Sequence, residues 1–324
     1  MCAVMTGMNF IQTTVNSLDR FQQRYRLTAF VYAVIKKYGE DQAGHQAALL
    51  TYYAFLSIFP LLLVLTTITG LIAGSHPDIQ RSIIQGLTNY IPVLGSQLSA
   101  HVQGIHKTGL ALLIGLLFTF YGARGVADVF RNGVNHLWRV PLIKRDVFPK
   151  SLIKNSTIIV GGGLGLVLAS ICSGLAAAAG HGPIVRIFSI LVNIAVLFGL
   201  FSWLLNTALP QHVSFKDVRA GALTAAIGLV LLQSFGALLL RSELKSLDAV
   251  YSYFAIALGL LFWLYLQSQV LYYSIEIAAV HTQKLWPRSL TSDNLTVADK
   301  DALTYQVAEA QSLEGQRIKT KIKR

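Results

Sequence analysis

The chain has 324 residues, of which 53% are hydrophobic and only 13% are charged, and its mean hydropathy is +0.53. Soluble domains carry about 25% charged residues, so this composition excludes a disordered chain, a secreted disulfide scaffold and a coiled coil. It indicates an all-α, polytopic membrane protein. The net charge of +12 fits nucleic acid, anionic lipid or membrane topology, and only its distribution can separate these.

Residues 1–46 are predicted to form a cytoplasmic N-terminal segment. Within it, apolar residues recur at helical spacing between Leu27 and Tyr38, with Lys36 and Lys37 among them. This pattern is typical of an amphipathic helix that lies on the cytoplasmic membrane face. It fits equally well a helix that packs on the bundle, so both interpretations stay open.

Six segments reach the roughly 20 mostly apolar residues that a bilayer-crossing helix needs. They lie near residues 47–73, 109–129, 153–179, 184–209, 218–240 and 251–280. Together they define a transmembrane domain over residues 47–280. Pro60 removes one backbone hydrogen bond and is expected to kink the first span. The loop 74–108 is predicted to carry two short amphipathic helices on the outer face.

Lysine and arginine are distributed unevenly between the spans. Alternate segments hold 22 of them on one side of the membrane and 5 on the other. Because basic loops stay in the cytoplasm, both termini are predicted to be cytoplasmic. The positive charge is then mostly a topology signal, and we expect no nucleic-acid partner. The polar, basic tail 281–324 is interpreted as mobile, cytoplasmic and able to touch anionic lipid.

Small residues recur at helical spacing in the third and fifth spans, where helices can approach closely. The positions of interest are Gly161, Gly165, Gly174, Gly221 and Gly228. Close packing is one explanation for them, and hinge freedom in a moving helix is the other. The sequence does not separate the two.

Ionisable residues at membrane depth are costly and usually face the bundle interior or water. Arg124 and Asp128 are four residues apart and can form an ion pair. We expect the following polar residues to gather near the cytoplasmic end of the spans: Arg124, Asp128, Asn132, Asn206, Arg219 and Glu276. The cluster is either a structural ion network or a site for a lipid headgroup or a proton.

Several sequence motifs of enzymes are missing. The chain has no glycine-lysine loop for ATP, no histidine cluster with metal-ligand spacing and no nucleophile elbow. We therefore predict no catalytic residues, no metal site and no cofactor, and we expect the protein not to be an enzyme.

Four segments resemble, in order, the blocks of the YihY/BrkB family of inner-membrane proteins. They are HQAALLTYYAFLSIFPLLLVL (45–65), YGARGVADVFRNGVNHLW (121–138), LPQHVSFKDVRAGALTAA (209–226) and YSYFAIALGLLFWLYLQSQVLYYSIEIAAV (251–280). The last block retains a glutamate at Glu276. The family often has small residues just before this glutamate, whereas this chain has Tyr273, Ser274 and Ile275. The resemblance implies a bacterial inner-membrane location, six helices and both ends inside. The motif SHP at residues 75–77 is similar to YhjD-like members, so a place in that branch of the family is also compatible with the sequence.

Three functions are compatible with the sequence. The first is a transporter or flippase-like protein for an amphipathic lipid or cell-envelope precursor. Its partners would be membrane lipids, including anionic lipid or a lipopolysaccharide precursor, as the YhjD-like branch implies. The second is a non-catalytic membrane scaffold for envelope proteins. The third, a ribonuclease, follows only from an old misassigned label of the family and ranks last. A monomer and a homo-oligomer both fit the sequence.

Overall fold

The computed structural model describes residues 16–73, 109–178, 183–210, 213–243, 249–291, 294–314, 316 and 318. Its helices are α2 (Arg26–Glu40), α3 (Ala43–Ala73), α6 (Gly109–Leu137), α7 (Lys150–Ala178), α8 (Pro183–Ala208), α9 (Phe215–Glu243), α10 (Ala249–Thr282), α11 (Val297–Glu309) and the 3-10 turn η2 (Leu142–Lys144). A further helical segment, residues 16–24, precedes α2. The described residues contain no strand, which confirms the all-α prediction.

Each of the six apolar segments predicted from the sequence falls on one long helix, α3, α6, α7, α8, α9 or α10, with its predicted ends within a few residues of the helix or inside it. Among the described residues, α7, α8 and α9 contain stretches long and apolar enough to cross a membrane. The loop 74–108 lies outside the described residues. The helix of α3 continues through Pro60, whose side chain is not among those described.

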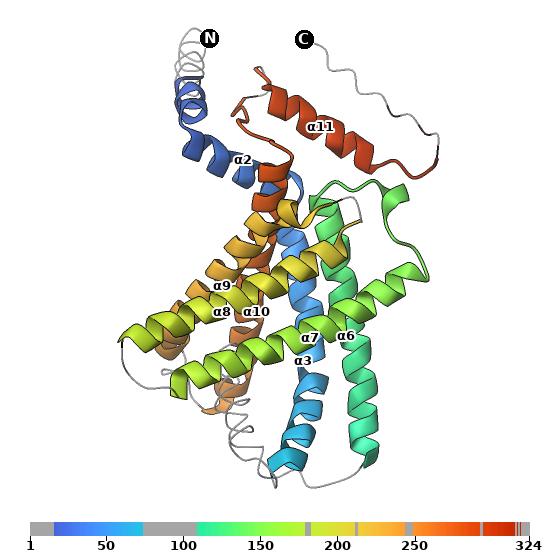
Figure 1. Ribbon diagram of the computed structural model, residues 1–324, viewed down its shortest axis with the longest axis vertical. Helices are drawn as coiled ribbons and strands as arrows, with labels where there is room; N and C mark the ends of the chain where they lie inside the picture. The colour runs from blue at the N-terminus through green and yellow to red at the C-terminus, as the bar shows by residue number, and fades with distance from the viewer. Residues whose placement is uncertain are drawn as a thin grey trace.

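The long helices pack as a bundle around one core. α3 contacts α6 and α10, α9 contacts α8 and α10, and α7 lies against α8. The shared core contains Ala47 of α3, Phe130 of α6, Leu205 of α8, Ala222 of α9 and Ile275 of α10. α3, α6 and α10 run along the molecule, while α7, α8 and α9 cross it obliquely (Figure 1).

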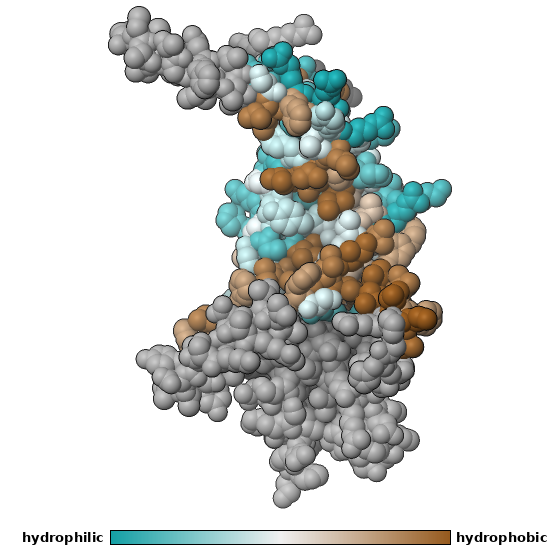
Figure 2. Space-filling model, turned by 90° about the vertical axis from the view of Figure 1, so that its left-hand side faces the viewer, coloured by the Kyte–Doolittle hydropathy of each residue, from teal (hydrophilic) through white to brown (hydrophobic). Residues whose placement is uncertain are grey.

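Large apolar side chains cover much of the bundle surface. Leu117 and Phe118 of α6, Leu164 of α7 and Phe188 of α8 are all more than half exposed. Figure 2 shows a broad hydrophobic band on one side of the described part of the bundle. Contiguous apolar surface of this extent is unusual for a soluble monomer and is what lipid-facing helices require.

Several glycines stand where two helices come close together. A Cβ atom at Gly221 of α9 would lie 2.6 Å from the carbonyl oxygen of Ser274 on α10, and one at Gly228 would lie 2.6 Å from Val270 Cγ1. Gly161 and Gly165 of α7 face Trp203 and Leu200 of α8 in the same way. Gly174 also lies on α7, but its surroundings are not among those that the structure describes.

We expect Gly221→Ala to lower the free energy of unfolding by about 1–3 kcal/mol, because the added methyl group meets backbone that cannot move aside. Gly163→Ala is the matched control, since a Cβ atom there would have no neighbour within 4 Å. It should be neutral or slightly stabilising, as alanine favours helix. Unfolding of the purified protein in mixed micelles measures both, and equal effects would contradict the packing argument.

The tail differs from the mobile segment predicted from the sequence, because residues 297–309 form α11. Thr296 caps this helix: its hydroxyl accepts a hydrogen bond from the backbone N–H of Asp299, while the Asp299 side chain accepts one from the backbone N–H of Thr296. Such a reciprocal cap satisfies two otherwise unpaired donors. α11 and α2 lie at the same end of the molecule (Figure 1).

Candidate functional site

The ends of several helices meet at one end of the bundle through side-chain to backbone hydrogen bonds. Asn135 Nδ2 of α6 donates to the carbonyl oxygen of Ala208 at 3.1 Å, which joins the ends of α6 and α8. Thr282 Oγ1 of α10 donates to the Asp217 carbonyl oxygen of α9 at 3.0 Å. Most of the charged side chains with ion-pair partners in the described part of the chain lie at this end.

Lys37 of α2 is the centre of a buried ion network. Its Nζ lies 2.5 Å from Asp41 Oδ2 and 2.7 Å from Glu276 Oε2, and it donates to the Leu137 carbonyl oxygen at 2.6 Å. Lys37, Asp41 and Glu276 are each 3% exposed or less. An ammonium group has three donors, so all three of its hydrogen bonds are made. The network ties α2 to α6 and α10.

The network continues through Arg139, which follows α6. Its guanidinium pairs with Asp41 and, at 2.8 Å, with Glu309 Oε2 of α11. Arg145 Nη2 also reaches Glu309, at 2.7 Å, and His136 Nδ1 lies 2.6 Å from the same carboxylate. Lys37, Arg139 and Arg145 thus balance the carboxylates of Asp41, Glu276 and Glu309. We call this set the central ion network.

The pKa values of the groups outside the spans agree with full ionisation at neutral pH. Burial alone would raise the pKa of Glu309, but the hydrogen bonds from His136 and Arg139 lower it from 4.5 to about 2. Burial also opposes the charge of Arg139, yet the carboxylates of Asp41 and Glu309 raise its pKa above the ordinary value. Both side chains are therefore charged partners.

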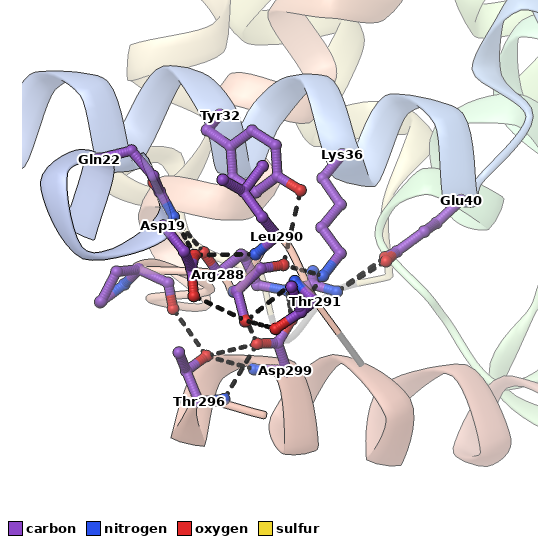
Figure 3. Close-up of polar contacts among 12 residues, drawn as sticks. Asp19, Gln22, Tyr32, Lys36, Glu40, Arg288, Leu290, Thr291, Thr296 and Asp299 are labelled. Atoms are coloured by element: carbon purple, nitrogen blue, oxygen red, sulfur yellow. Dashed lines mark hydrogen bonds and ion pairs between the residues drawn. The ribbon is translucent and has the colours of Figure 1, made fainter. Parts of the chain in front are cut away.

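A second cluster joins α2 to α11 and to residues 288–291 (Figure 3). Arg288 Nε lies 2.5 Å from Asp299 Oδ1, and its Nη2 lies 2.8 Å from Glu40 Oε1. Lys36 Nζ reaches Asp299 at 3.0 Å, and Asp19 accepts the Leu290 backbone N–H at 2.9 Å. We call this set the α2–α11 cluster.

Asp299 is the acceptor on which the α2–α11 cluster converges. Burial alone would raise the pKa of Asp299. The guanidinium of Arg288, the backbone N–H of Ser289, the hydroxyl of Thr296 and the ammonium of Lys36 together hold it well below its usual range. The carboxylate is thus ionised, and its loss of hydration is offset by these donors and by the backbone N–H of Thr296.

A third cluster links α6 to α7. Arg131 Nε donates to Asn155 Oδ1 at 2.9 Å, and Arg131 Nη2 lies 3.2 Å from Asp128 Oδ1. Asn132 and Asn155 also donate to Asp128, at 3.2 and 3.1 Å. The Asp128 side chain is nevertheless 49% exposed, so it keeps a free side toward the surroundings.

The structure divides the polar cluster that the sequence predicts. Glu276 belongs to the central ion network, and Asp128 pairs with Arg131 rather than with Arg124, the partner that the sequence suggests. Asn155 of α7 accepts a hydrogen bond from Arg131 Nε and so holds that guanidinium beside Asp128. Within the described residues Asp128 and Asn132 come together, while Arg124, Asn206 and Arg219 make no ion pair or hydrogen bond to the other predicted residues. Those three are exposed.

Arg124 contributes instead to an exposed polar face of α6, which we define as Tyr121, Arg124, Asp128 and Asn132. These positions follow one another at spacings of three and four residues, so they share one side of the helix. Leu117, one turn before Tyr121, continues the same side as apolar surface and is 68% exposed. The face therefore runs from lipid-like surface to charge along one helix.

Several buried polar atoms lack hydrogen-bond partners in the described part of the chain, and two of them lie close to the central ion network. They are Glu276 Oε1 and the Tyr272 hydroxyl, both on α10. A small cavity of about 10 Å³ lies beside the network and is lined by Lys37, Asp41, Arg139 and Tyr305 among others. It has room for about one water molecule. Among the described residues, no three His, Cys, Asp or Glu side chains could hold a metal ion.

The sequence reasoning missed most of the central ion network. Lys37, Asp41, Arg139 and Glu309 lie outside the apolar segments, so the cost of a charge at membrane depth does not single them out. The spacing of Lys37 and Asp41, four residues apart near a helix end, was a readable signal.

An all-helical bundle with exposed apolar faces and charge concentrated at one end is the architecture of a helical membrane protein. Comparison with known proteins gives the family. The family model described as Virulence factor BrkB matches residues 34–294, and the chain belongs to this family, in agreement with the resemblance seen in its sequence.

Three relatives illustrate the similarity. A UPF0761 membrane protein of Psychrobacter sp. (strain PRwf-1) is 28% identical over 281 residues, which cover 80% of this chain and 50% of the relative. One of Vibrio vulnificus (strain YJ016) is 25% identical, covering 78% and 82%. The inner membrane protein YhjD of Escherichia coli (strain K12) is 22% identical, covering 78% and 80%. No solved structure matches the chain.

Proposed function

We propose that this chain is a multi-pass protein of the bacterial inner membrane, with six spans and both termini in the cytoplasm. We further propose that it moves an amphipathic lipid or a cell-envelope precursor across that membrane in a flippase-like manner. The family membership, the apolar surface of the bundle and the basic residues gathered at one end support the membrane placement.

The exposed polar face of α6 is the observation that carries the transport proposal. A charged side chain on a spanning helix is costly when it faces acyl chains. Arg124 is exposed and the Asp128 side chain is half-exposed, on the same side of α6 as apolar Leu117 and aromatic Tyr121. Such a face suits a ligand with a charged headgroup and an apolar tail, because each half of the ligand meets a surface of its own kind.

The remaining residues take supporting roles in this proposal. Arg219 and Asn206, exposed near the start of α9 and the end of α8, offer further donors to an anionic headgroup at the cytoplasmic end. Glu276 does not meet the headgroup, since it is fully buried against Lys37. Its role is to hold α10 against α2, or to exchange a proton through its unpartnered Oε1.

The proposal is tested by reconstituting the full chain into liposomes that contain a fluorescent anionic phospholipid and adding an impermeant quencher. We expect the wild type to expose inner-leaflet lipid much faster than protein-free vesicles do. Arg124→Glu should slow this rate about tenfold or more, because a charge-assisted hydrogen bond is worth about 1.5–3 kcal/mol. Lys300→Glu, an exposed change on α11, is the control. A wild-type rate equal to that of empty vesicles would refute transport of this lipid.

A membrane scaffold is the second candidate, favoured by the ordered surface that α2 and α11 form together. Deleting residues 288–324 would remove Arg288 and Glu309 and so disturb the fold itself. Exposed Val297 and Leu303 on α11 offer a gentler test. Val297→Asp with Leu303→Asp should abolish function in cells if the protein is a scaffold, and should leave lipid movement in liposomes unchanged.

A further inference from the structure

An apolar surface on α2 and on the helical segment before it has no partner in the described part of the chain. Its members are Leu18, Phe21, Tyr25, Leu27, Val31 and Ile35, all more than half exposed, with Leu27 at 82%. We call this set the outer apolar face. The buried side of α2 packs elsewhere, with Ala33 and Val34 against Val280 and Leu285. The helix therefore has two apolar sides, of which the protein itself covers one.

The outer apolar face points away from α11. With 3.6 residues per turn, Val31 lies about 140° around the helix from Lys36 and about 180° from Glu40. Lys36 and Glu40 point toward residues 288–291 and α11, as Figure 3 shows. The α2–α11 cluster thus fixes the rotation of α2, and that rotation directs Val31 to the opposite side.

The charges around the outer apolar face are positive. Arg20, Arg24 and Arg26 are exposed beside it. Asp19 is the one acidic residue between positions 16 and 39, and it is 6% exposed because Leu290 and Ser289 cover it with hydrogen bonds. A cationic rim around an apolar stripe complements anionic lipid headgroups above acyl chains.

The same pairing of an exposed aromatic ring with an exposed cation recurs at the ends of the bundle helices. Phe148, 78% exposed, stands two residues before Lys150 at the start of α7, and Phe215 precedes Lys216 at the start of α9. Aromatic rings next to basic residues mark the level of a membrane interface. Figure 2 shows hydrophobic patches among hydrophilic atoms at the end that carries α2.

We infer that residues 18–35 form an interfacial segment that lies in the headgroup region of the membrane and binds anionic phospholipid, with the outer apolar face immersed and the three arginines at the phosphates. The inference requires that the chain spans a membrane, but not that it transports anything. A soluble protein partner or a second copy of the chain would need a neutral or acidic counter-surface against three arginines. A bilayer supplies the apolar and the anionic layer together, and the spans already hold it beside α2.

The inference is tested on the full chain with Cys2 and Cys172 replaced by serine, reconstituted in nanodiscs of phosphatidylcholine with or without phosphatidylglycerol. A spin label is attached in turn at Val31→Cys, at Leu117→Cys as the lipid-facing control and at Lys300→Cys as the water-facing control. Accessibility to oxygen and to a nickel chelate reports the depth of each label. We expect the label at position 31 to favour oxygen, with a depth between the two controls.

Two further readings make the result decisive. Arg24→Glu with Arg26→Glu should shift the label at position 31 toward the water value, and the shift should be larger in discs with phosphatidylglycerol. A label at position 31 that matches the one at position 300 in both kinds of disc would overturn the inference. So would a label shielded from both reagents, which would show that protein covers the face.

Discussion

Replacing Lys37 by methionine is expected to lower the free energy of unfolding by about 3–5 kcal/mol, the usual cost of removing one partner from a buried ion pair. The side chain of Glu276 has no exposed surface, and its second oxygen already lacks a hydrogen bond. Without the ammonium its charge would be buried alone. Unfolding of the purified protein in mixed micelles measures the loss.

The neighbouring substitution Lys36→Met is the matched control for Lys37→Met. Lys36 is partly exposed, and its partner Asp299 keeps Arg288, so the loss should be about 1 kcal/mol or less. The double variant Lys37→Met with Glu276→Leu should recover much of the stability, because an apolar pair can replace a buried ion pair. Similar losses for Lys36→Met and Lys37→Met would contradict the arrangement of the central ion network.

Replacing Asp299 by asparagine is expected to release α11 from α2. The carboxylate accepts hydrogen bonds from Arg288, Ser289, Thr296 and Lys36. Asparagine leaves the two cations without a negative charge and places an NH₂ donor where Oδ2 accepts from Ser289 and Thr296. A loss of about 3 kcal/mol corresponds to more than a hundredfold rise in the detached population. Hydrogen exchange of the α11 amides measures this rise. Asp301→Asn, an exposed change two residues away, should leave exchange unchanged.

Acid should have the same effect as Asp299→Asn. The folded pKa of Glu309 is lowered from 4.5 to about 2, and that of Asp299 also lies below its usual range. A lowered folded pKa contributes stability that is complete above the unfolded value and is lost as the pH falls through the folded value. The attachment of α11 should therefore weaken between about pH 4.5 and 2. Protection of the α11 amides, taken relative to the intrinsic exchange rate at each pH, that stays constant over this range would argue against charged partners.

The long helices could be predicted from the sequence, because burial in lipid leaves a strong local signal, a run of about 20 apolar residues. The residues at which these helices end could not be predicted in this way. α6 continues to Leu137, beyond the predicted end at 129, because polar Asn132 and Asn135 still fit a helix that has left the apolar layer. Hydropathy reports membrane depth, whereas a helix ends where its hydrogen bonds and caps end.

The polar clusters were harder to predict, because ion pairs between distant residues leave no local pattern. Nothing near Glu276 indicates that its partner is Lys37. Depth alone therefore groups Glu276 with Arg124 and Arg219, and the amphipathic pattern that contains Lys37 gives no sign of a partner on α10. α11 carried a usable signal in Thr296 and Asp299, the spacing of a helix cap, within a tail whose polar composition suggested no structure.

The pairing of Lys37 with Glu276 spans 239 residues, which has a consequence for how the chain is made. At about 5–20 residues per second, the ribosome needs roughly 10–50 s to reach the glutamate after it has added the lysine. During that interval the ammonium group can pair with Asp41 but not yet with Glu276. A nascent chain that stops before α10 lacks the ion pair that ties α2 to α10, so this part of the network closes late in synthesis.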